Sequence, residues 1–169
     1  MLEQNVIILP TCQLAYVRMT GPYPTSSVNA WQRVLEWLDA RGHNVLVDAG
    51  FGLAIDDPRM TPADKLRYDA GVLVPSSWND ADLAYVSLRK FCGGAYFKKR
   101  NVGCYQSLGR IVSEARDLLV PREGLIHDMA RPVVTINYSY PSKTPPGEQI
   151  ADICIPILAD ARLQPRVIH

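Results

Sequence analysis

The alternation of hydrophobic and polar residues predicts strands separated by two amphipathic helices. A strand is expected over 14–20, where every second residue is apolar. A helix is expected from about 25 to 41, and Gly42 supplies its C-terminal stop. The apolar stripe of this helix recurs with a period near 3.6 residues and consists of Val28, Trp31, Val34, Leu35 and Leu38.

The second half of the chain repeats the order of elements found in the first half. The first half is predicted as strand, helix, strand and strand, at 14–20, 25–41, 51–55 and 68–74. The second half is predicted in the same order, at 95–100, 105–120, 132–138 and 150–157. We interpret this order as a tandem duplication of one β-α-β-β unit, with repeats over about 12–75 and about 93–157.

The duplication predicts an α+β fold. Neither unit can bury its helix and strands well alone, so the two units should form one antiparallel sheet with two long helices on one face. Residues 1–169 are then a single domain with pseudo-twofold symmetry. In this comparison Ala15-Tyr16 corresponds to Ala95-Tyr96, and Asp69 corresponds to Asp152.

One stretch between the predicted strands of the first half is unusually specific. Residues 56–75 read DDPRMTPADKLRYDAGVLVP. Pro58 ends the preceding strand because it lacks a backbone donor. A helix of about one turn is expected next, capped by the Thr61 hydroxyl and by Asp64, with Pro62 at its first position.

This stretch resembles the signature loop of GyrI-like small-molecule-binding domains. That family includes bacterial DNA gyrase inhibitory proteins and the effector-binding domains of certain transcription activators. The matching positions are Asp57-Pro58, Thr61-Pro62 and 65–69, which read Lys-Leu-Arg-Tyr-Asp. The resemblance implies two SHS2-like units related by a pseudo-twofold axis, with a ligand cleft along that axis.

Composition and charge exclude several function classes. The 169 residues are 47% hydrophobic and 21% charged, as expected for a globular domain. A net charge of +1, with one basic cluster at 98–100, predicts no direct nucleic-acid binding. No apolar run approaches the ~18 residues of a membrane span. Because no signal-peptide pattern is present either, we expect a cytoplasmic protein without membrane contact.

The chain also lacks recognisable catalytic and metal-binding motifs. Its four cysteines and three histidines are scattered, without metal-ligand spacing. No nucleophile-elbow motif and no phosphate-binding glycine loop occur. We therefore expect no catalytic residue, no metal and no cofactor.

Aromatic residues are the main candidates for binding a small aromatic or hydrophobic ligand. Small-molecule clefts are mostly apolar and aromatic, with a few aimed polar groups. The predicted cleft lining comprises Tyr16, Trp37, Tyr96 and Tyr105, with Trp31 as a further candidate. Trp37 is favoured over Trp31 because it borders the buried stripe of its helix. Each of these residues also fits an ordinary half-buried core position.

The resemblance adds two polar candidates, Thr135 and Asn137. The family has a Pro-x-Phe-Glu-x-Tyr pattern in the strand before the last one, and its glutamate pairs with cationic aromatic ligands. Pro132 sets the register, so Thr135 stands at the glutamate position and Asn137 at the tyrosine position. Without the carboxylate, a neutral polar ligand that accepts hydrogen bonds from these residues, or donates to them, is expected instead.

Two alternatives to small-molecule binding stay open. The resemblance to gyrase inhibitory proteins predicts a protein-interaction role with DNA gyrase as partner. The third alternative is hydrolysis of a small ligand, for which Tyr96 and Tyr105 are the available residues. The missing glutamate makes this third alternative the weakest, because the hydrolytic members of the family depend on such a residue.

Overall fold

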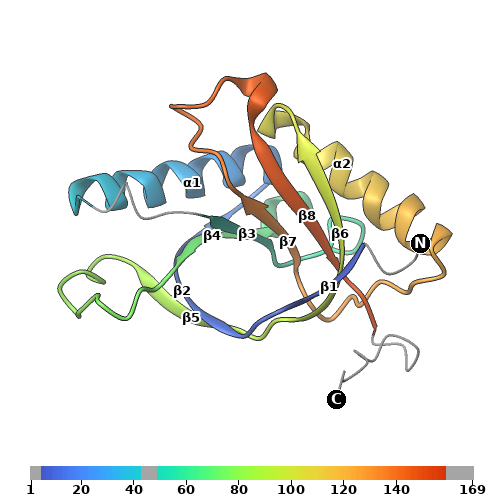
Figure 1. Ribbon diagram of the computed structural model, residues 1–169, viewed down its shortest axis with the longest axis horizontal. Helices are drawn as coiled ribbons and strands as arrows, with labels where there is room; N and C mark the ends of the chain where they lie inside the picture. The colour runs from blue at the N-terminus through green and yellow to red at the C-terminus, as the bar shows by residue number, and fades with distance from the viewer. Residues whose placement is uncertain (1–4, 43–48, 159–169) are drawn as a thin grey trace, which may run out of the picture.

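A single antiparallel sheet forms the centre of the molecule (Figure 1). The computed structural model describes residues 5–42 and 49–158. The sheet has eight strands in the order β1-β6-β8-β7-β3-β4-β2-β5. The strands are β1 (Val6–Leu9), β2 (Cys12–Thr20), β3 (Gly50–Ala54), β4 (Arg67–Leu73), β5 (Ser87–Phe91), β6 (Gly94–Val102), β7 (Val133–Asn137) and β8 (Ile150–Pro156). The predicted α+β class and the single antiparallel sheet are confirmed.

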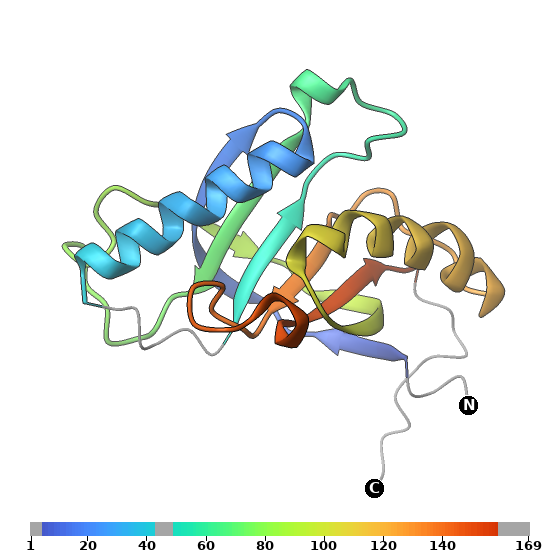
Figure 2. The same cartoon turned by 90° about the horizontal axis from the view of Figure 1, so that it is seen from above.

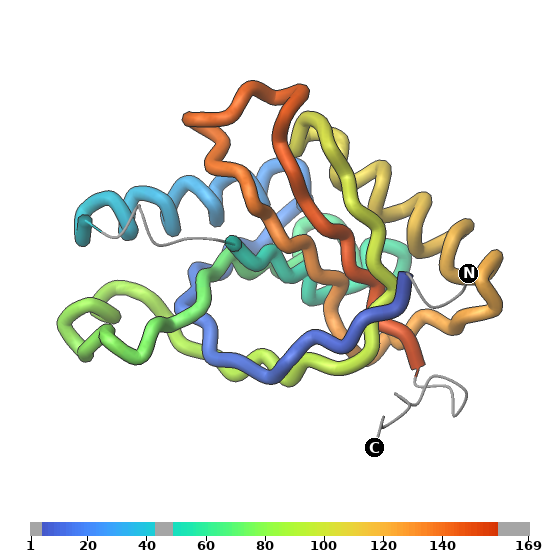
Figure 3. Tube along the Cα trace, viewed as in Figure 1, coloured from blue at the N-terminus to red at the C-terminus, as the bar shows by residue number. Residues whose placement is uncertain are grey.

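The sheet curls because residues 6–9 and 12–16 pair with residues 94–97 and 87–91 of a second continuous segment. The segment β1–β2 runs antiparallel to β5–β6, with Leu9 opposite Gly94 and Cys12 opposite Phe91. Figure 3 shows these two segments side by side. Gly93, at φ +66°, lies where they meet, and a Cβ there would be 2.2 Å from the Leu9 carbonyl oxygen. Only glycine permits this approach.

Both helical segments cover the same face of the sheet (Figure 2). Helix α1 (Tyr23–Ala40) packs on β2 and β4 through the buried residues Ala30, Val34 and Leu38. Gly42, at φ +68°, follows its end, as predicted. The prediction placed Val28 in the buried stripe, but its side chain is 60% exposed, because it lies on the side of α1 turned away from the sheet.

The second helical segment is not one regular α-helix as predicted. It begins with the 3-10 turn Tyr105–Ser107, continues as α2 (Leu108–Glu114), widens into the π-helical turn Ala115–Leu119 and ends as α3 (Val120–Arg122). Ala115, Val120 and Ile111 of this segment are buried against Phe97, Ile153 and Ile155. The π turn inserts one extra residue, and such bulges are frequent at functional sites.

The loop between β3 and β4 differs from the predicted capped helix. Its helical part is a 3-10 turn, Ala63–Lys65, with Pro62 at the N-cap and no side-chain capping bond, so the Thr61 and Asp64 caps were wrong. Asp56 orders the loop instead. Its carboxylate accepts hydrogen bonds from the backbone N–H of Arg67, at 2.9 Å, and from the Arg67 guanidinium.

Backbone contacts at the start of each helical segment match between the two halves. The Tyr23 hydroxyl donates to the Asp56 carbonyl at 2.6 Å and accepts from its N–H at 3.0 Å. The Tyr105 hydroxyl makes the same pair of bonds with Ser139, at 3.1 and 3.0 Å. Tyr105 thus holds the start of its helix against the end of β7.

The ladder register corrects one predicted correspondence. Ala15 of β2 stands opposite Val72 of β4, and Phe97 of β6 stands opposite Ile155 of β8. When the Arg18–Asp69 pair is aligned with the Arg100–Asp152 pair, Ala15 is therefore aligned with Phe97 and not with Ala95. A comparison of two short sequence matches missed this two-residue shift, because Ala-Tyr occurs in both strands by coincidence.

Apolar residues form cores on both faces of the sheet. Leu53, Phe91 and Tyr96 belong to a cluster enclosed by the curl, on the face without helices. One cluster lies under α1, and another lies under α2 and the π turn. The enclosed face is therefore filled, and the helix-covered face is the one with two separate cores.

A buried carboxylate on the face without helices links three strands. Asp69 of β4 is fully buried and pairs with both Arg18 of β2 and Arg89 of β5. Arg18 binds it in bidentate fashion, at 2.7 and 2.9 Å. Among the arginines of residues 5–42 and 49–158, Asp152 of β8 pairs with Arg100 alone, at 2.8 and 3.0 Å.

Replacing Asp69 should destabilise the protein strongly. In Asp69→Asn we expect the free energy of unfolding to fall by about 3 kcal/mol, because two partly buried guanidinium groups lose their counter-charge. Urea denaturation followed by circular dichroism measures this loss. Asp152→Asn is the matched control. Its partner Arg100 has a side chain that is 55% exposed, so we expect a loss of about 1 kcal/mol. Equal losses would contradict the assigned role of Asp69.

Candidate functional site

The two central strands, β3 and β7, lie between the two helical segments (Figure 2). They pair with Gly50 opposite Asn137 and with Gly52 opposite Thr135. Opposite residues of an antiparallel ladder point to the same side of the sheet. These four residues share the helix-covered face, because Gly50 and Gly52 also stand opposite Val72 and Ala70, which pack under α1.

Two aromatic side chains lie directly over the glycines of β3. A Cβ on Gly50 would be 2.5 Å from the ring of Trp31, and a Cβ on Gly52 would be 2.0 Å from the Tyr68 hydroxyl. Any larger residue at either position would therefore displace an aromatic ring. Glycine inside a strand often marks such a close approach to the backbone.

A hydrogen bond connects these two aromatic residues, and Thr135 lies beside them. The Trp31 Nε1–H donates to the Tyr68 hydroxyl at 3.0 Å, and the hydroxyls of Tyr68 and Thr135 both lie over Gly52. Burial raises the pKa of Tyr68, so its hydroxyl stays protonated at neutral pH. The indole of Trp31, the phenol of Tyr68 and the alcohol of Thr135 thus lie together as uncharged polar groups at the centre of the sheet.

Near Trp31, Tyr68 and Thr135, two amide side chains have buried atoms that form no hydrogen bond within the described residues. These atoms are Oδ1 of Asn137 and Nδ2 of Asn101. Asn137 stands opposite Ala151, which stands opposite Asn101, so the two amides lie in one row across β7, β8 and β6. Only the small Ala151 side chain separates them. An unpaired acceptor and an unpaired donor at this spacing can be satisfied together by one polar molecule.

The structure brings together part of the predicted site. Thr135, Asn137 and Trp31 lie on the helix-covered face at the centre of the sheet. Trp37 does not join them. Its indole N–H donates to the Ala84 carbonyl at 3.0 Å, and its ring contacts Trp78 edge-on at 5.5 Å between centroids.

The three predicted tyrosines also lie away from Thr135. Tyr96 is 1% exposed inside the curl, and Tyr16 lies on the same face without helices. Tyr105 bonds backbone groups at the start of its helical segment. Sequence reasoning missed Tyr68 and Asn101. The alternate glycines of β3 were the available signal, because they leave the strand centre open to side chains from elsewhere.

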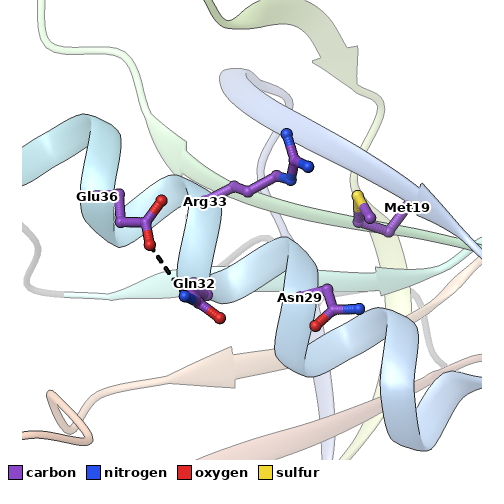
Figure 4. Close-up of a pocket in the computed structure, with 5 residues that line it drawn as sticks. All are labelled: Met19, Asn29, Gln32, Arg33 and Glu36. Carbon is purple, nitrogen blue, oxygen red and sulfur yellow. Dashed lines mark hydrogen bonds between the residues drawn. The ribbon is translucent and has the colours of Figure 1, made fainter.

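A surface hollow of about 460 Å³ lies along the outer side of α1 (Figure 4). Its lining residues are Met19, Asn29, Gln32, Arg33 and Glu36. Gln32 donates to Glu36 at 3.0 Å, one turn apart on the helix. The lining is polar apart from Met19, and this composition differs from the mostly apolar sites that bind small molecules.

Two further properties bear on the kinds of site present. Within residues 5–42 and 49–158, no group of three or more potential ligands could hold a metal ion. No helix in the same ranges is both long enough and apolar enough to cross a membrane.

Two curated bacterial proteins resemble parts of this chain. A Bacillus subtilis (strain 168) protein, described as the SPbeta prophage-derived transcriptional regulator YosT, is 32% identical over 91 residues, which are 52% of this chain and 58% of the relative. A DNA gyrase inhibitor of Citrobacter rodentium is 27% identical over 84 residues, which are 49% of this chain and 52% of the relative. The chain thus spans little more than half the length of these relatives.

Solved structures share the fold at low sequence identity. A conserved protein from Listeria innocua superimposes with a TM-score of 0.67 and 16% identity, covering 90% of this chain and 91% of the other. The structure of SAV2435 bound to tetraphenylphosphonium gives a TM-score of 0.62 and 15% identity, covering 90% and 92%.

The model of the GyrI-like small molecule binding domain matches residues 5–158, which include all eight strands and both helical segments. The chain therefore belongs to the family of GyrI-like small molecule binding domains.

Proposed function

We propose that this domain binds a small neutral aromatic molecule over β3 and β7, between the two helical segments. The observation that carries the proposal is the pair of unpaired amide atoms on Asn137 and Asn101, in the same region as the uncharged polar groups of Trp31, Tyr68 and Thr135. Aromatic walls with a few convergent polar groups are typical of small-molecule sites.

The proposed site lies on a pseudo-twofold axis between two duplicated β-α-β-β units. The central pairing of β3 with β7 is flanked by β4 and β2 on one side and by β8 and β6 on the other. The matching bonds of Tyr23 and Tyr105, and the matching Arg18–Asp69 and Arg100–Asp152 pairs, support this duplication. Gly52 and Thr135 occupy equivalent positions beside the axis.

Ligand entry requires a side-chain rearrangement. Trp31 and Tyr68 now cover the glycines at contact distance, so a flat ring can reach the strand only if Trp31 rotates away from Gly50. The incoming ring would take over the packing of the indole on the β3 backbone. Stacking against the displaced aromatic side chain would add about 0.5–1.5 kcal/mol beyond the buried area.

The unpaired amides specify the polar part of the ligand. The Asn137 Oδ1 needs a donor, and the Asn101 Nδ2 needs an acceptor. Each buried polar atom that finds its partner recovers about 1–3 kcal/mol. A molecule that carries both functions, such as an aromatic amide or lactam, is therefore favoured over a plain hydrocarbon.

Thr135 favours neutral ligands over cations. It stands where the family resemblance places a glutamate, and its hydroxyl lies over Gly52 beside that of Tyr68. The buried Asp69 on the neighbouring strand points to the opposite face. The tetraphenylphosphonium bound by the structural neighbour is a cation, and we expect this chain to differ in that preference.

Replacing Asn137 should raise the stability of the protein and lower its affinity for the ligand. In Asn137→Leu we expect the free energy of unfolding to rise by about 1 kcal/mol, because a buried unpaired oxygen is removed at similar volume. We expect the affinity for aromatic amides to fall about tenfold, because the same oxygen is lost as a ligand partner. Urea denaturation and thermal shifts across a panel of such amides measure the two effects.

The control for this variant is Asn29→Leu. Asn29 is exposed on the outer side of α1, so this variant should bind ligands as the unchanged protein does. A destabilised Asn137→Leu that keeps its ligand affinity would contradict the proposal. A panel in which no aromatic amide raises the melting temperature of the unchanged protein would do so as well.

Restoring a carboxylate should change the ligand preference. In Thr135→Glu we expect tetraphenylphosphonium to bind at least about tenfold more tightly, because a carboxylate in a low-dielectric site attracts a cation strongly. Thr135→Gln has the same shape without the charge and should show no gain. Isothermal titration calorimetry of both variants compares them directly. Equal affinities would show that this position does not contact the ligand.

A gyrase-directed role is the second candidate function. It rests on the 27% identity to a DNA gyrase inhibitor over about half of each chain. This candidate predicts that a molar excess of the protein inhibits DNA supercoiling by purified gyrase, and that Asn137→Leu inhibits equally well because the contact surface is elsewhere. Absence of inhibition at high excess would remove this candidate.

A further inference from the structure

A second polar site lies on the face of the sheet without helices, around Tyr16. Tyr16 is opposite Gly71 on β4 and opposite Ser87 on β5, so it stands in the middle of three strands. The guanidinium carbons of Arg18 and Arg89 lie 5.9 and 5.8 Å from the centroid of its ring. Two cations thus flank one aromatic ring.

The charges at this site do not balance. Arg18 and Arg89 carry two positive charges and share one carboxylate, that of Asp69. The nearby Arg67 adds no excess charge, since it is paired with Asp56. One positive charge is therefore left over on side chains that are 37% and 27% exposed.

Arg89 carries the unused hydrogen-bonding capacity. Arg18 commits its Nε and Nη2 atoms to Asp69, whereas Arg89 reaches Asp69 through Nη1 alone. Its Nε and Nη2 atoms, which form the fork that matches a carboxylate, make no bond to the rest of the described chain. A guanidinium held by one atom and open along this fork is oriented to bind a second carboxylate.

The equivalent place in the second half lacks this arrangement. There Asp152 accepts from the single guanidinium of Arg100 and from the Tyr138 hydroxyl, at 3.1 Å. In the first half, Arg89 of β5 stands opposite Leu14 of β2. At the equivalent position in the second half, Ile7 of β1 stands opposite Tyr96 of β6. The additional guanidinium is therefore a property of the first half and not a requirement of the fold.

We propose that Tyr16, Arg18 and Arg89 bind a small aryl carboxylate on this face of the sheet. The carboxylate pairs with the open fork of Arg89, and the ring of the ligand stacks against Tyr16. Arg18, fixed by Asp69, adds the second positive charge without changing its own bonds. The site is separate from the proposed ligand site over β3 and β7, which lies on the opposite face.

Benzoate is the probe, and the Nε–Hε resonances of the arginines report on it. In a titration of the unchanged protein followed by ¹⁵N-edited NMR, we expect the Arg89 resonance to shift and saturate at millimolar benzoate. Benzamide, which has the same shape without charge, should leave it in place. Added salt should weaken benzoate binding, because the site is partly exposed.

Variants of Arg89 distinguish the contribution of the bidentate Nε and Nη2 contact from that of the positive charge. Arg89→Gln should lower the benzoate affinity at least tenfold. Arg89→Lys should lower it several-fold, because it keeps the charge and loses the fork. Arg110→Gln is the control, since Arg110 has a 75% exposed side chain on α2. Asn137→Leu should bind benzoate normally, which distinguishes this site from the other one.

Two results would overturn the proposal. One is a benzamide titration that shifts the Arg89 resonance as far as benzoate does. The other is an Arg89→Gln variant that folds as the unchanged protein does and keeps its benzoate affinity. Because Arg89→Lys preserves the ion pair with Asp69, it keeps the test decisive even if Arg89→Gln is unstable.

Discussion

The close packing of Trp31 and Tyr68 on the bare backbone of β3 organises the helix-covered face of this domain. Two glycines make that packing possible, since a Cβ at either would fall within 2.5 Å of an aromatic side chain. The bond between Trp31 and Tyr68 in turn ties α1 to β4, the strand next to β3. At these two positions β3 has no side chain on the helix-covered face, and the side chains of Trp31 and Tyr68 cover its backbone instead.

The face of the sheet without helices is packed differently. There the curl encloses a filled apolar cluster, and the buried carboxylates of Asp69 and Asp152 pair with guanidinium groups. A filled interior gives the domain a rigid platform, because close-packed cores deform little. The side-chain rearrangement that the proposed ligand site requires would leave this platform in place.

Much of this architecture was predictable from the sequence, and the failures have physical causes. Hydrophobic periodicity located α1 and six of the eight strands, all but β1 and β5, and Gly42 marked the end of α1. Periodicity could not find the π turn at 115–119, since one inserted residue hardly alters an apolar stripe. It also placed Val28 in the core, although Val28 lies on the side of α1 turned away from the sheet.

The candidate site was harder to predict than the fold. Thr135 and Asn137 were found through a family pattern anchored on Pro132, and they do lie side by side with the glycines of β3. Tyr68 and Asn101 were missed, because they come from β4 and β6 and meet the site only through strand order. Trp37 was preferred to Trp31, yet a segment from 78 to 84, which the helix pattern cannot reveal, covers Trp37.

The unpaired amides are the main support for the proposed ligand site. A buried oxygen or N–H without a partner costs free energy, and an apolar residue of similar size at Asn137 or Asn101 would avoid that cost. A structural role for these amides would have given them partners within the protein, as Asp56 and Ser139 have. Unpaired atoms beside aromatic side chains are instead what a site needs if its partner comes from outside.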